Sequence, residues 1–209
     1  MYEFNFQMRW DLFDELEEKE PHLTAVRHFT LKAAYFSDED EDPDSPGQAC
    51  AKLTGCFFDC TQIDYDYAQF FDEDNADDAN FCDLFDGVVY ADEVVDATNL
   101  LWPSELILLH KLHVYTGHRG KGLGITMLEH LAGLFNGSVD FMALKAFPLA
   151  FKDSEDHQIS TQEKDKKKDP AAEKKLISLY EKAGFKLIGL DDPIMIRLPA
   201  DPMAIRQPQ

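Results

Sequence analysis

Apolar residues recur along this chain at spacings that alternate between those of strands and those of helices. A continuous apolar stretch that ends in alternation covers residues 106–114, as expected for a central strand that loses cover at one end. A helical spacing follows and stops at Asn136-Gly137, and a second apolar strand is expected over residues 139–147. The apolar face of the intervening helix consists of Ile125, Leu128, Ala132 and Phe135.

The first half of the chain has a less regular pattern. Its predicted elements are a helix over residues 10–19, strands over 24–36, 50–63 and 88–95, and short helices near 65–71 and 81–85. Gly55 indicates a bulge inside the second of these strands. Residues 37–47 combine dense acidic charge with two prolines and therefore predict a loop.

A charged insertion of residues 152–168 interrupts the apolar pattern of the second half. We expect a surface loop there, which either contacts a substrate or is a tolerated insertion. Asp169-Pro170 then supplies an N-cap and a proline for the first helical position, and the helix that they start should stop at Gly184.

The turn between the central strand and its helix reads Arg-Gly-Lys-Gly-Leu-Gly over residues 119–124. Glycines let backbone amides approach a ligand, and a helix N-terminus adds partial positive charge, so the turn predicts a phosphate cradle. The glycine spacing does not fit a dinucleotide fingerprint. A Walker loop does not fit either, because Gly122 follows Lys121.

Arg119, Gly122 and Gly124 instead form an Arg-x-x-Gly-x-Gly pattern, and a helix carrying Tyr180 ends in Gly184-Phe185. In this order the two features resemble the hallmarks of the GNAT superfamily of N-acyltransferases. The resemblance covers roughly residues 105–198. It implies an α/β (α+β) fold with a splayed, mostly antiparallel central sheet flanked by helices, acetyl-CoA as co-substrate, and a single domain over residues 1–209.

The resemblance also implies where coenzyme A would bind. Backbone groups at the end of the central strand would hold the thioester carbonyl and its oxyanion, and the glycine turn with the start of its helix would hold the pyrophosphate. The implied cofactor-binding residues are Leu112, His113, Val114, Arg119, Gly120, Lys121, Gly122, Leu123, Gly124 and Ile125.

Acetyl transfer to an amine requires a base, because a lysine-like amine must first lose a proton at a cost of about 4–5 kcal/mol at neutral pH. His110 stands where some members of the superfamily carry a catalytic His or Glu, with Glu105 and His113 as alternatives. Tyr180 would protonate the departing thiolate. Because side chains alternate along a strand, His110 and His113 should face opposite sides unless a bulge intervenes, and no metal site is expected.

The composition of the chain restricts the classes of molecule that it can be expected to bind. The chain has 209 residues, 44% of them hydrophobic, which is enough for one substantial core. Its formal net charge of -20 disfavours nucleic acid as a partner. The acidic surface either gathers a cationic amine acceptor or only promotes solubility. Cys50, Cys56, Cys60 and Cys82 form no Cys-x-x-Cys pair, so we expect buried or idle thiols.

The sequence contains no signal-peptide pattern and no apolar stretch that would span a membrane, so we expect a cytoplasmic protein that does not act at a membrane. Its predicted function is acetyl transfer from acetyl-CoA to a primary amine by direct attack in a ternary complex. Two alternatives remain open. One is a noncatalytic acyl-CoA-binding module whose acidic face docks a basic partner, and the other is an acidic interaction protein without a cofactor.

Overall fold

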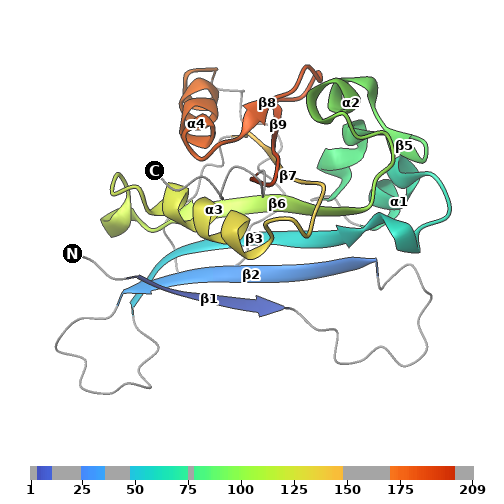
Figure 1. Cartoon of the computed structure of the whole chain (residues 1–209). Helices are drawn as coiled ribbons and strands as arrows, with labels where there is room; N and C mark the ends of the chain where they lie inside the picture. Colours follow the sequence, from blue (N-terminus) through green and yellow to red (C-terminus); the bar gives the residue numbers. More distant parts are fainter. Residues whose placement is uncertain (1–3, 11–24, 36–47, 75–77, 148–169, 201–209) are drawn as a thin grey trace, which may run out of the picture.

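The computed structural model of the protein describes residues 4–10, 25–35, 48–74, 78–147 and 170–200 (Figure 1). The loop expected at residues 37–47 and the insertion at 152–168 lie outside these ranges. The helix expected over residues 10–19 also lies outside them, apart from Trp10, which is the last residue of a strand.

A seven-stranded sheet in the order β1-β2-β3-β6-β7-β9-β8 forms the centre of the molecule (Figure 1). Neighbouring strands are antiparallel except for β6 and β7, which are parallel. The prediction of a mixed fold with a mostly antiparallel sheet is thus confirmed. The strands are β1 (Phe4–Trp10), β2 (Val26–Tyr35), β3 (Gln48–Asp59), β6 (Glu105–Val114), β7 (Phe141–Lys145), β8 (Lys186–Leu187) and β9 (Ile194–Arg197), while β4 (Phe85–Asp86) and β5 (Val89–Tyr90) form a separate hairpin.

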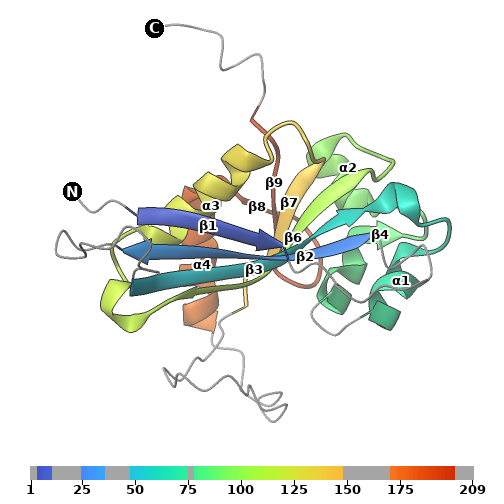
Figure 2. The same ribbon diagram turned by 90° about the horizontal axis from the view of Figure 1, so that it is seen from below.

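Helices cover both faces of the sheet. They are α1 (Tyr67–Asp74), α2 (Asp92–Thr98), α3 (Leu123–Leu134) and α4 (Pro170–Lys182), together with the 3-10 helices η2 (Cys60–Gln62), η3 (Asp78–Leu84) and η4 (Thr116–His118). Alternate residues of β6 enter different hydrophobic clusters, Leu106 and Leu108 one and Ile107 and Leu109 the other. Figure 2 accordingly shows α3 on one side of the strands and α1 on the other.

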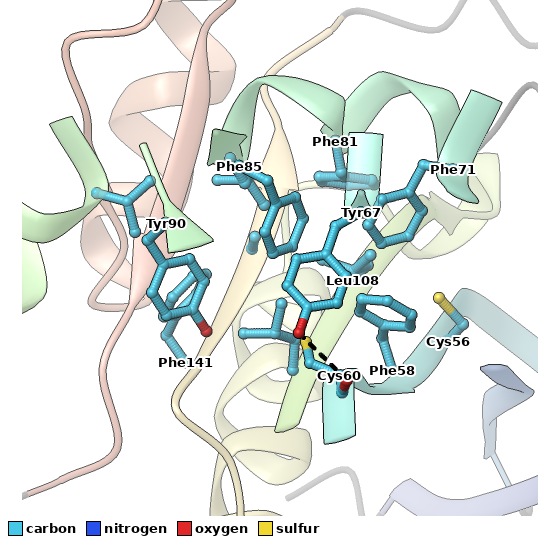
Figure 3. Close-up of a cluster of buried hydrophobic side chains, with 14 of the residues drawn as sticks. Cys56, Phe58, Cys60, Tyr67, Phe71, Phe81, Phe85, Tyr90, Leu108 and Phe141 are labelled. Carbon is cyan, nitrogen blue, oxygen red and sulfur yellow. Dashed lines mark hydrogen bonds between the residues drawn. The ribbon is translucent and has the colours of Figure 1, made fainter. Parts of the chain in front are cut away.

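The first cluster packs α1, η3 and α2 against the sheet through a group of aromatic rings (Figure 3). Phe58 of β3 is at its centre, with ring centroids 4.6 Å from Phe71 and 5.4 Å from Phe70. The Tyr67 hydroxyl donates to the carbonyl of Cys60 at 3.3 Å, and burial raises the pKa of this phenol. The short helices predicted near residues 65–71 and 81–85 are therefore confirmed as α1 and η3, and aromatic packing holds them in place.

The second cluster packs α3 and α4 against the opposite face of the sheet. The fully buried side chains of α3 are Leu123, Met127, Leu128 and Leu131. The face predicted from sequence is thus shifted, because Ile125, Ala132 and Phe135 lie at its half-buried margin. Burying this apolar stripe fixes the helix directly after β6.

The strand predicted over residues 88–95 is wrong for most of its length. Only Val89–Tyr90 pairs as a strand, and α2 follows at once. Asp92 and Glu93 occupy the first turn of α2, where negative charge stabilises a helix N-terminus, and Asn99 ends it in the left-handed conformation with a φ of 62°. These helix signals outweigh the β-propensity of the valines.

Asp140 anchors the start of β7 to the start of β6. Its amide donates to the carbonyl of Glu105 at 2.7 Å. Its carboxylate accepts from the amide and hydroxyl of Ser104, at 2.8 Å and 2.9 Å, and from the hydroxyl of Tyr90 at 2.8 Å. The two parallel strands are therefore fixed together at this end.

Gly55 lies where β3 and β6 approach most closely. A Cβ atom at this position would stand 2.4 Å from the carbonyl oxygen of Leu108. The β3–β6 register shifts at the same point, between Thr54 and Gly55, but the extra residue belongs to β6, so the bulge predicted within β3 lies in its partner strand. A side chain here would have to displace backbone, and backbone yields less readily than a flexible side chain.

The variant Gly55→Ala should therefore lower the free energy of unfolding by about 2 kcal/mol or more, because the added methyl group overpacks the β3–β6 interface. Gly133→Ala is the matched control, since Gly133 is exposed on α3 with nothing within 4 Å of an added Cβ, and it should stabilise by about 0.5–1 kcal/mol. Urea denaturation measures both. Equal effects of the two variants would contradict the close approach of the strands.

Candidate active site

His110 is the extra residue of a bulge in β6. The register pairs Thr54 with Lys111 and Gly55 with Leu109, so no residue of β3 lies opposite His110. Leu109 packs on the α3 side of the sheet, whereas the ring of His110 contacts that of Phe81 on the other side, with centroids 6.2 Å apart.

The bulge also changes which residues share a face beyond it. Leu112 and Val114 pack toward α3, so His113 between them points to the face that His110 occupies. His110 and His113 therefore share a face, which is the exception that the sequence expectation allowed for a bulge. Among the described residues, no group of three or more His, Cys, Asp or Glu side chains could hold a metal ion.

Strands β6 and β7 separate immediately before the bulge. They pair only from Leu106 opposite Phe141 to Leu109 opposite Leu144. Strand β7 then ends at Lys145, while β6 continues to Val114. Over its last residues, β6 has β3 as its one strand partner within the described ranges.

The backbone of β6 exposes hydrogen-bonding groups on the edge away from β3. The Tyr115 amide donates to the carbonyl of Cys50 on β3 at 3.0 Å. Because successive residues direct their amide and carbonyl groups to opposite edges, those of Leu112 and Val114 point away from β3. The Val114 carbonyl accepts from Nε of Arg119 at 2.8 Å, which is consistent with this direction.

A cavity of about 200 Å³ opens where β6 and β7 separate. It is bordered by both strands, η3, the first turn of α4 and the segment between β8 and β9. The lining residues are Asn80, Phe81, Leu109, His110, Lys111, Lys145, Phe147, Glu173, Asp192 and Pro193. The cavity therefore meets β6 at the bulged histidine.

The glycine turn lies at the end of the same strand. Gly120 and Gly122 have φ angles of 75° and 80°, a region that favours glycine, and both are exposed with nothing within 4 Å of an added Cβ. Gly124 has another role, because a Cβ there would lie 3.3 Å from the Leu112 side chain. Its small size lets α3 pack closely on β6.

The start of α3 presents amides without protein acceptors. The first hydrogen bond of the helix runs from the Thr126 amide to the Gly122 carbonyl, and Gly122 provides no side-chain cap. Within the described part of the chain, the amides of Leu123, Gly124 and Ile125 have no hydrogen-bond acceptor. A helix start with this geometry suits an anionic ligand, and the exposed Arg119 and Lys121 side chains flank it.

Tyr180 lies on α4 with its side chain buried in the second cluster. Burial raises the pKa of its phenol to about 12, so the hydroxyl stays protonated at neutral pH and can donate a hydrogen bond. The C-terminal end of α4 is fixed by Arg197 of β9, whose Nη1 donates to the Ala183 carbonyl at 2.7 Å. Tyr180 is not one of the residues that line the cavity.

Glu105 is the one sequence candidate that lies far from this region. It pairs with Asp59 at the opposite end of β6, five residues and about 16 Å of strand from His110. The structure thus places His110, the end of β6 and the glycine turn along one strand and its connection to α3. Glu105 lies outside this region.

Several cavity residues were missed by the sequence patterns. Lys145 forms a short ion pair with Asp192, and its Nζ donates to Asn80 Oδ1 at 3.4 Å. These residues come from β7, the β8–β9 segment and η3, so no local spacing joins them. The only features of the sequence that marked these positions were the proline after Asp192 and the end of an apolar strand at Lys145, and neither indicates a cavity.

Comparison with family models and with curated proteins assigns the chain to no family. No family model matches it, and no curated protein matches it significantly. Across the described residues, no helix is both long and apolar enough to cross a lipid bilayer.

The raised pKa of Tyr180 gives a pH dependence of stability. A phenol whose pKa is higher in the folded state than its ordinary value of about 10 contributes stability fully below pH 10, and loses it as the pH rises toward 12. Between pH 9 and pH 11, the wild-type protein should thus lose about 1 kcal/mol more of its unfolding free energy than Tyr180→Phe. Urea denaturation at the two pH values measures this, and parallel losses would contradict burial of the phenol.

Proposed function

We propose that this protein is an N-acetyltransferase of the GNAT type, which transfers an acetyl group from acetyl-CoA to a primary amine. The observation that carries the proposal is the separation of β6 and β7 at the His110 bulge, directly before a glycine turn that opens α3. An acyl-CoA needs both features, because its pyrophosphate requires a set of amide donors and its extended pantetheine arm requires a gap beside a strand.

Each part of coenzyme A has a matching feature. The pyrophosphate would bind the amides of residues 120–125, with Arg119 and Lys121 adding charge. The pantetheine arm would lie along the free edge of β6, where the Leu112 and Val114 backbone groups point. An amide on this edge would also donate to the thioester carbonyl and stabilise its oxyanion, which requires geometry rather than a particular side chain.

The amine and the side chains would complete a direct transfer. His110 takes a proton from the incoming amine, and the nitrogen lone pair then attacks the thioester carbonyl carbon. The C–N bond forms, the C–S bond breaks, and Tyr180 donates its proton to the leaving sulfur. The nitrogen loses its second proton as it becomes an amide, this proton returns through solvent to the Tyr180 phenolate, and His110 releases the first proton to solvent. Tyr180 is not among the residues that line the cavity, so in this proposal it would reach the sulfur from the α4 side.

The acceptor we propose is a cationic amine. Glu173 borders the cavity, as does Asp192 in its ion pair with Lys145, and the net charge of -20 attracts cations from solution. Among the described residues, Cys50, Cys56, Cys60 and Cys82 form no disulfide, which suits a reducing compartment, and we propose that the enzyme acts in the cytoplasm.

Acetyl-CoA should bind the purified protein in a calorimetric titration, and Gly122→Leu should weaken that binding at least about tenfold by obstructing the turn. The matched control is Gly137→Leu. Gly137 has a φ of 77°, against 80° for Gly122, and neither has an atom within 4 Å of an added Cβ. Both variants therefore carry similar backbone strain, but only one lies at the glycine turn. Absence of binding heat from a folded wild-type protein, or equal loss in both variants, would refute the phosphate site.

Tyr180→Phe should lower kcat for acetyl transfer by about 10- to 100-fold and leave the Kd for acetyl-CoA within about twofold. The reason is that the hydroxyl acts on the sulfur only as the C–S bond breaks. Assays of acetyl transfer to a panel of polyamines, aminoglycosides and lysine peptides give kcat, and calorimetry gives the Kd for acetyl-CoA. Unchanged kcat would reduce Tyr180 to a packing residue. If acetyl-CoA binds and no amine is acetylated, the noncatalytic acyl-CoA-binding module replaces the enzyme.

A further inference from the structure

The cavity where β6 and β7 separate is bordered from both faces of the sheet. Phe81 of η3 belongs to the first cluster, whereas α4 packs in the second cluster, and residues of both elements line the cavity. The cavity therefore passes through the gap between the two strands. Its volume of about 200 Å³ lies below the roughly 300–1,000 Å³ of pockets for drug-sized ligands, so it admits a small and slender molecule.

Two lysines and two acidic residues line this cavity, and three of the four have partners. Lys145 forms an ion pair with Asp192, so these two charges offset one another. Lys111 also has an interaction partner. The carboxylate of Glu173 makes no hydrogen bond or ion pair within the described part of the chain. Glu173 is therefore the charged residue of the lining that remains for a ligand.

Glu173 lies on the face of α4 that meets the sheet. It precedes Ile177 by four residues and Tyr180 by seven, a spacing that places all three on one side of a helix. Tyr180 is buried in the second cluster, Ile177 packs against that cluster, and Glu173 is half-buried. Glu173 thus approaches the cavity from the α4 side, whereas the ring of His110 lies on the η3 side, against Phe81.

We propose that Glu173 binds one ammonium group of a linear diamine, and that this diamine is the acceptor whose other nitrogen is acetylated. The inference rests on the proposed function, in which His110 takes the proton of the reacting nitrogen. A single nitrogen is a poor match for both residues, because a carboxylate beside the reacting nitrogen would favour its protonated form, which has no lone pair for attack. Two nitrogens on one chain satisfy both, one neutral beside His110 and one charged beside Glu173.

The rest of the lining suits the methylene chain between the two nitrogens. Four apolar side chains border the same cavity, those of Phe81, Leu109, Phe147 and Pro193. A few polar groups among apolar walls are the usual composition of a small-molecule site, in which the polar groups fix the orientation of the ligand. The cavity therefore combines a carboxylate for the bound ammonium with walls that an alkyl chain can contact.

Amine binding tests the site without acetyl transfer. Calorimetric titrations with diaminobutane, in the presence and absence of coenzyme A, give the Kd of the wild-type protein and of Glu173→Gln. The variant should bind at least about tenfold more weakly, because the ammonium loses its charged partner. The matched control is Glu181→Gln, which removes the same charge from an exposed residue of the same helix and should stay within about twofold of the wild type. Equal weakening in the two variants, or a wild-type protein that does not bind diaminobutane in either condition, overturns the assignment.

Kinetics test whether Glu173 acts on the second ammonium in particular. Diaminobutane and butylamine have the same carbon chain, and only diaminobutane has a second nitrogen. In an active enzyme, kcat/KM for diaminobutane should exceed that for butylamine at least about tenfold. Glu173→Gln should lower this ratio to about twofold, the statistical factor for two equivalent nitrogens, through the diaminobutane value alone. Glu173→Asp should retain the preference, because it retains the charge. A residue that only stabilised the start of α4 would change kcat/KM for both amines equally.

The two measurements separate this inference from the proposed function. A wild-type protein that acetylates neither amine, yet binds diaminobutane in a manner that depends on Glu173, refutes the proposed function and keeps the diamine site. An active wild type with equal kcat/KM for the two amines, or with a ratio that Glu173→Gln does not alter, refutes the diamine assignment alone.

Discussion

The close backbone contact between Gly55 and Leu108 is the constraint on which the candidate site depends. No side chain fits there, since a Cβ on residue 55 would meet the Leu108 carbonyl oxygen at 2.4 Å. At this contact β6 gains one residue over β3, which brings His113 onto the face that His110 shares with Leu108 and coincides with the end of β6–β7 pairing. The bulge at Gly55 thus decides which side chains share a face with His110, and the gap begins at the same point of β6.

The two ends of the β6–β7 pair are stabilised differently. At the end where the two strands begin, the Asp140 carboxylate accepts hydrogen bonds from Ser104 and Tyr90, and the Asp140 amide donates to the carbonyl of Glu105. We call this the closed end. At the open end, β6 pairs with no strand on this edge among the described residues, although its Val114 carbonyl accepts from Arg119, and the amides of Leu123, Gly124 and Ile125 have no acceptor in the described chain. The rigid closed end holds the open edge in place, which is the preorganised arrangement that a binding site requires.

The sequence predicted the part of the fold that local signals determine. Strand β6, α3 and β7 follow from apolar periodicity, and the glycine turn follows from residue chemistry alone. Gly55 indicated an irregularity in the sheet, but not that the extra residue lies in β6 or how it redirects His113, because both depend on the register between strands. Lys145 and Asp192 were missed, since only the assembled sheet brings them together, and α2 was predicted as a strand because the valines concealed its helix caps.

The most direct test of the coenzyme A site that we propose at the start of α3 is an amide NMR titration of the nitrogen-15-labelled protein with coenzyme A. The pyrophosphate should shift the amides of Gly120, Gly122, Leu123 and Gly124 most strongly, because these donors would change their hydrogen-bond acceptor from water to phosphate oxygen. The pantetheine arm should shift Leu112 and Val114 in the same titration. Shifts concentrated elsewhere on the molecule, or an unchanged spectrum at millimolar coenzyme A, would contradict a coenzyme A site at the start of α3.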